Sequence, residues 1–107
     1  MEGTREKVYE IKIETEGGMI RLHQNHAVAV FTNSVIKWTC DKYPFAVQFK
    51  PGSPLQAKRG ENNSFVLDMG EKATLYCTYK YTIAVYDTDN KMVLILDPVL
   101  VPIPPKG

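Results

Sequence analysis

Apolar and polar residues alternate along most of this chain, and no segment carries the spacing of an amphipathic helix. In residues 8–14, Ile11 and Ile13 fall on one face while charged residues fall on the other. Residues 45–49 repeat the pattern with Phe45, Val47 and Phe49 on one side. A period of two is that of a strand with one buried face. The alternation therefore predicts an all-β protein.

Turn-forming residues divide this pattern into segments of strand length, as at Gly17-Gly18 and over residues 87–90. About seven to nine short strands separated by turns are typical of a β-sandwich or a barrel. The expected strands cover residues 8–14, 19–23, 26–31, 35–39, 45–49, 64–68, 73–86, 91–96 and 99–101, with a long irregular loop over 50–63. Their inward positions predict a core of Ile11, Ile13, Val28, Val30, Ile36, Trp38, Val47, Phe49, Ile83, Val85, Val93 and Ile95.

Length and charge limit the domain organisation and the classes of partner. A chain of 107 residues is expected to form a single domain over residues 1–107. The 13 basic and 12 acidic residues leave a net charge of +1 without any block of one sign, so nucleic acid is not an expected partner. The longest apolar run, residues 92–96, is far shorter than the roughly 18 residues of a membrane span, so no membrane insertion is expected.

The compartment stays open at this point. Residues 1–7 are polar and do not resemble a signal peptide. The protein is expected in the cytoplasm, or outside it (exported or periplasmic) if a signal peptide has been removed.

Two segments resemble parts of the cupredoxin family. Residues 35–49 give a strand that ends near Trp38, a short polar loop, and Pro44 leading into another strand. Residues 76–81 place Cys77 where the family's cysteine ligand would stand. The resemblance implies a Greek-key β-sandwich of cupredoxin-like type and an exported protein, and an immunoglobulin-like sandwich is the alternative fold.

The same resemblance implies that the copper ligands are missing. The family's histidine, just after the proline, is replaced by Phe45, and Lys80 stands near the place of a second ligand. Blue copper needs two imidazoles and a thiolate. We therefore expect no metal and no cofactor. The alternative is an atypical site drawn from the remaining candidate ligands Cys77, Cys40, His23 and His26.

Cys40 and Cys77 also form a candidate disulfide, because the cupredoxin topology would bring the two segments together and export would favour oxidation. The other interpretation is two thiols that act as small buried hydrophobes.

No catalytic signature is present, so no enzymatic activity is expected. The first hypothesis is a non-catalytic binding or accessory module that contacts a protein or a small ligand through its loop ends. The second is an atypical copper or electron-transfer protein, and the third is a structural, adhesion-type domain that pairs through an exposed strand. The expected contact residues are Tyr43, Pro44, Phe45, Tyr79, Lys80, Lys58 and Arg59.

Overall fold

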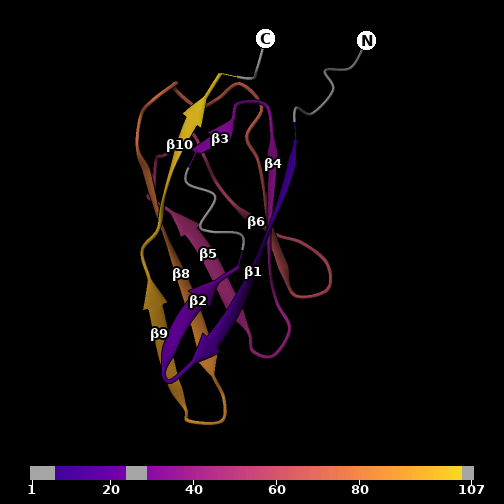
Figure 1. Cartoon of the computed structure of the whole chain (residues 1–107), viewed down its shortest axis with the longest axis vertical. Coiled ribbons are helices and arrows are strands. Elements are labelled where there is room, and N and C mark those ends of the chain that lie inside the picture. The colour runs from indigo at the N-terminus through magenta and orange to yellow at the C-terminus, as the bar shows by residue number, and fades with distance from the viewer. Residues whose placement is uncertain (1–6, 24–28, 105–107) are drawn as a thin grey trace.

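Two β-sheets face each other along the length of the molecule (Figure 1). The structure is a computed structural model that describes residues 7–23 and 29–104. Within these residues there are ten strands and no helix, so the prediction of an all-β, sandwich-like protein is confirmed. Nothing in this part of the chain forms a helix that is long and apolar enough to cross a membrane.

The first sheet is mixed, because two strands that are distant in the sequence run side by side in the same direction. Its order is β2 (Met19–Leu22), β1 (Val8–Glu16), β4 (Val35–Cys40), β7 (Ser64–Asp68) and β6 (Lys58–Arg59). β1 and β4 are parallel, and Ile11 is the partner of Trp38. The other neighbours pair antiparallel.

The second sheet is built around its longest strand, β8 (Tyr79–Asp87). β5 (Phe45–Phe49) pairs with one side of β8. On the other side, β9 (Met92–Leu96) and then β10 (Val99–Ile103) pair with successive parts of β8. β3 (Ala29–Phe31) runs parallel to β10, so this sheet is also mixed.

The core lies between the sheets and is centred on Trp38, which has no exposed surface. The Tyr81 ring meets the indole edge-on at 5.3 Å, and the Phe49 ring does so at 6.4 Å. Phe45 packs against Phe65 in the same way, with ring centroids 5.3 Å apart. Such edge-to-face pairs are favourable for aromatic quadrupoles. This aromatic cluster therefore joins β4 and β7 of one sheet to β5 and β8 of the other.

Most of the expected core residues are buried, but two assignments on β9 are wrong. Val93 and Ile95 are exposed, while Leu94 between them is buried. The pairing of Leu94 with Val85 decides which β9 side chains face the core, because directly opposed residues lie on the same face of a sheet. Val28, also expected in the core, lies outside the described residues.

Two expected segment boundaries also differ. The strand expected over residues 73–86 begins only at Tyr79, because the chain before it turns, and Tyr76 adopts a φ of 64°. The expected loop over residues 50–63 contains the short strand β6. Gly60 follows β6 where a Cβ would lie 2.6 Å from Ser64 Oγ, so a larger residue there would displace the Ser64 hydroxyl.

Candidate functional site

The outer face of the second sheet is organised by the register of β5, β8 and β9. Tyr86 of β8 is opposite Val93 of β9. Ala84, two residues earlier on β8, lies between Ile95 of β9 and Ala46 of β5. Side chains two residues apart share a face, so all five point away from the core. We call these five residues the apolar strip: Ala46, Ala84, Tyr86, Val93 and Ile95.

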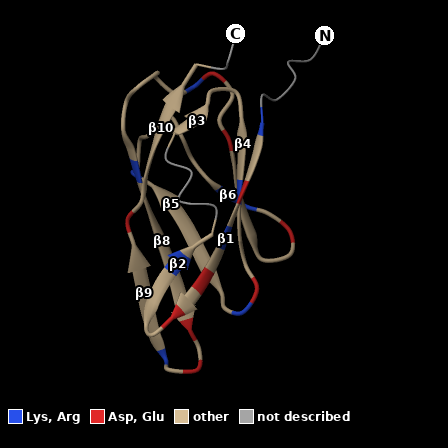
Figure 2. Cartoon of the chain, viewed as in Figure 1, with Lys and Arg blue, Asp and Glu red and all other residues tan. Residues whose placement is uncertain are grey.

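The apolar strip is unusually exposed for aliphatic residues. Val93 is 60% exposed, Ile95 57% and Tyr86 44%. The solvent face of an antiparallel sheet is normally polar, whereas these positions carry no charge. Figure 2 shows β9 without a charged residue along its length and with charged segments beyond its two ends. A contiguous exposed apolar patch of this kind is a candidate interaction surface.

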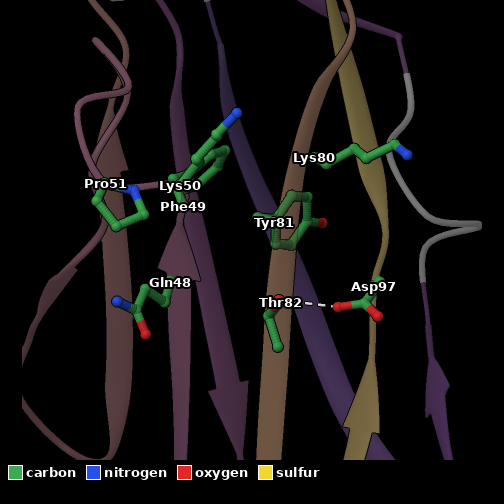
Figure 3. Close-up of a pocket in the computed structure, with 8 residues that line it drawn as sticks. All are labelled: Gln48, Phe49, Lys50, Pro51, Lys80, Tyr81, Thr82 and Asp97. Atoms are coloured by element: carbon green, nitrogen blue, oxygen red, sulfur yellow. Dashed lines mark hydrogen bonds between the residues drawn. The ribbon is translucent and has the colours of Figure 1, made fainter.

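The same face becomes polar further along β8. An open groove with a volume of about 560 Å³ is lined there by Gln48, Lys50, Pro51, Lys80, Thr82 and Asp97, together with Phe49 and Tyr81, whose rings lie on the core side of the sheet. The two rings stack with centroids 4.9 Å apart. Thr82 Oγ1 donates to Asp97 Oδ1 at 2.8 Å (Figure 3).

The groove offers charged and hydrogen-bonding groups to a ligand. Figure 3 shows the Lys50 ammonium group pointing towards the top of the view and the Lys80 ammonium group towards its right side, so they do not converge on one point. Burial raises the pKa of the Tyr81 hydroxyl, which therefore stays protonated at neutral pH. The groove can supply two cations and hydrogen-bonding groups to a bound surface.

A polar network occupies the end of the sandwich at the β8–β9 turn. The Tyr43 hydroxyl donates to Asp89 Oδ2 at 2.6 Å, and this hydrogen bond, followed by burial, raises the pKa of Tyr43 above its ordinary value. Asp87 is buried and accepts from the backbone N–H groups of Asp89 and Asn90 and from Asn90 Nδ2. The Asn90 side chain is the largest cause that lowers the pKa of Asp87. These groups satisfy one another, so the network closes the turn.

The expected contact residues are divided between two places. Tyr43 and Phe45 are buried, which corrects the expectation that their side chains form a contact surface; Pro44 between them is exposed. Tyr79 is half-buried, and its hydroxyl accepts from the Thr74 N–H at 2.8 Å. Of this set, Lys80 is exposed and lines the groove.

Lys58 and Arg59 lie on the other sheet, away from the groove. They form β6 at the edge of the first sheet, and both are exposed. The Arg59 guanidinium lies 4.8 Å from the centre of the Phe65 ring. Arginine stacked on an aromatic face covers apolar surface as well as carrying charge. Arg59 therefore shields the core at this edge.

The expected disulfide is not formed, because the two cysteines lie at opposite ends of the sandwich. Cys40 is buried at the end of β4 opposite Ile13, and Cys77 is exposed before β8 begins. The N–H of Tyr76, next to Cys77, bonds to the Pro102 carbonyl at the far end of β10. Both thiols are free.

The candidate copper ligands are likewise not brought together. Phe45 is opposite Val85, whereas Lys80 lies five residues back along β8, roughly 17 Å away at about 3.4 Å per residue. His23 is exposed, and its Nε2 lies 2.7 Å from Glu14 Oε1. No group of three metal-binding side chains occurs in residues 7–23 and 29–104, and His26 lies outside them. The described donors do not fit a copper site.

Sequence reasoning missed the apolar strip, although its signal is visible. Residues 92–96 are apolar at every position, whereas a strand with one wet face normally alternates. An unbroken apolar run predicts either a strand buried on both faces or one whose outer face is covered by a partner. Val93 and Ile95 are exposed, so nothing among the described residues covers the outer face of β9.

The comparisons with known proteins add no relative. Neither the family models nor the curated proteins compared with this chain gave a match.

Proposed function

We propose that this protein is a non-catalytic binding or accessory module without copper, which holds a protein partner on the outer face of its second sheet. The observation that carries the proposal is the exposure of Val93, Ile95 and Tyr86 in one uncharged strip. Aromatic and aliphatic side chains at the centre of a contact surface supply most of the binding free energy of an interface. A rigid sheet presents them without an ordering cost.

The groove beside the strip defines the chemistry of the partner. Lys50 and Lys80 are exposed at the polar end of this face, while the apolar end has no charge. A complementary partner therefore has an apolar centre with carboxylates on one side. Charge complementarity of this kind sets orientation and selects among partners.

The wide separation of the candidate ligands argues against the alternative of copper handling or electron transfer. The proposed topology is a Greek-key sandwich of cupredoxin-like type rather than an immunoglobulin-like one. The β5–β8 pairing supports it, because the loop before β5 and the β8–β9 turn share one end of the molecule.

A structural module that pairs through an exposed strand is a second candidate function. It is favoured by β9, which pairs with β8 alone among the described residues.

Selection from a displayed library of random peptides tests the first proposal. Bound peptides should combine apolar residues with Asp or Glu. Tyr86→Lys should weaken their binding more than about tenfold, since it places a charge at the centre of the strip. Lys80→Ala should weaken it by about fivefold, through loss of one charge pair.

Lys58→Ala is the matched control, because it removes an exposed lysine from the opposite sheet. Its binding should equal that of the unmodified protein. Failure to enrich any peptide, or equal binding by the Tyr86→Lys protein, would contradict the proposal.

A further inference from the structure

Among the described residues, one side of β9 is paired with no strand, and β2 of the other sheet lies beside part of it. A slot with a volume of about 340 Å³ separates it from β2, with Gly18, Met19 and Ile20 on one side and residues 93–96 on the other. β2 pairs with β1 and does not pair with β9. An unpaired edge presents a row of N–H and C=O groups on which another strand can form.

The edge of β9 also lacks the features that normally prevent such pairing, namely charge, proline or very short length. The edge strand β6 consists of two cations, Lys58 and Arg59. β2 contains Arg21, which forms an ion pair with Glu16. β9 and the edge strand β5 each have five residues without a charge or a proline. Of these two strands, β9 is the one flanked by opposite charges, Lys91 and Asp97, whereas β5 lies between Pro44 and Lys50.

The sequence around Leu94 is complementary to itself in an antiparallel pairing. With Leu94 opposite its own copy, Val93 faces the partner's Ile95, and Met92 faces the partner's Leu96. Directly opposed β-branched residues stabilise a strand pair. Just beyond the strand ends, Lys91 faces the partner's Asp97, and the same pair recurs at the other end.

We propose that a second copy of this chain pairs with β9 in this register, joining the second sheets of two molecules across a twofold axis through Leu94. The inference rests on the second of the proposed functions, pairing through an edge strand. A twofold contact uses the same surface on both molecules, so a self-complementary strand is what it requires.

Charge fixes the register. Moving it by two residues in either direction sets Lys91 opposite Ile95 or Val99 and removes both ion pairs. Moving it by one residue turns the side chains to the opposite faces, which the buried Leu94 does not allow. In the proposed register the two apolar strips become neighbours on one continuous face.

Sedimentation equilibrium of the protein alone, at concentrations up to about 1 mM, tests the proposal. The mass should rise from that of one chain towards that of two. Val93→Lys combined with Ile95→Lys sets lysine opposite lysine, so this protein should remain a single chain. Both positions are exposed, which makes the substitutions compatible with folding.

A charge exchange tests the register independently of those lysines. Lys91→Glu places two carboxylates opposite each other at both ends and should raise the dimer dissociation constant about tenfold. Adding Asp97→Lys restores opposite charges and should recover most of the affinity. Lys58→Glu makes the same charge change on β6 and should leave the dissociation constant unchanged.

A protein that stays a single chain at every concentration overturns the pairing of β9. A dimer whose dissociation constant is unchanged by Lys91→Glu also overturns it, because the contact between its two chains then lies elsewhere. Peptide binding by the outer face is measured separately on dilute protein with Tyr86→Lys. A protein that binds peptide but does not dimerise therefore refutes the edge pairing alone. A protein that dimerises through β9 but binds no peptide refutes only the proposed binding by the outer face.

Discussion

β6 and β9 are both edge strands, yet β6 is charged and β9 is apolar. β6 is formed by Lys58 and Arg59, and the Arg59 guanidinium lies over the Phe65 ring. β9 exposes Val93 and Ile95 and contains no charge. Charge on an edge opposes strand addition, so the proposal assigns partner binding to the β9 edge and not to the β6 edge.

The turns beside these strands differ as well. The turn between β6 and β7 is held by neutral groups, with Ser64 Oγ donating to the Glu61 carbonyl at 2.6 Å and Asn63 Nδ2 donating to the Cys40 carbonyl at 2.7 Å. The turn between β8 and β9 is held by the Asp87 carboxylate. Only the second turn depends on an ionised group.

Truncation of one side chain at each edge should give the largest contrast. Phe65→Ala should lower the free energy of unfolding by about 3 kcal/mol, because the ring is buried against Phe45. Val93→Ala should change it by less than about 0.5 kcal/mol in dilute protein, because Val93 faces solvent. Urea unfolding of both variants measures the difference, and equal losses would show that the outer face is covered within a single chain.

A smaller effect, confined to acidic solution, should appear at the β8–β9 turn. The hydrogen bonds from Asn90 and its neighbours lower the pKa of Asp87 below its ordinary value of 3.8. A lowered pKa contributes stability that is present above the ordinary value and is lost as the pH falls through the lowered one. The free energy of unfolding should therefore fall in that acidic range, and less steeply in Asp87→Asn.

The β6–β7 turn is the internal control for this titration. The hydrogen bond from Asn63 Nδ2 to the Cys40 carbonyl joins neutral groups, so it should persist over the same pH range while the amide NMR chemical shifts of residues 87–90 move. Equal slopes for the unmodified and Asp87→Asn proteins would contradict the role given to the carboxylate.

The sequence predicts the interior of this fold well wherever alternation is clear. Ile11, Trp38, Phe49 and Ile83 each stand in a segment with period two, and each is buried. Alternation fails over residues 92–96, where every side chain is apolar and no face is preferred. The pairing of Leu94 with Val85 decides which of these side chains face the core, and that pairing depends on how the strands meet in the folded chain.

The candidate site was harder to predict, because it depends on strand direction. Pro44 and Lys80 both seemed to belong to loop ends that would meet. The nine residues of β8 carry them apart, with Phe45 beside Val85 and Phe49 beside Tyr81. Tyr76 and Cys77 lie in the turning chain that precedes β8, which no alternation signal marks. A local sequence pattern predicts where the strands lie along the chain. It does not predict which strand ends lie next to one another on the surface.

Amide hydrogen exchange at two protein concentrations tests the open edge of β9 most directly. In dilute protein, the β9 amides that do not bond to β8 should exchange quickly, and in concentrated protein they should become protected. The amides of Lys58 and Arg59 should exchange at the same rate in both samples. β9 amides that are already protected in dilute protein, or unchanged on concentration, would contradict an edge that a second copy closes.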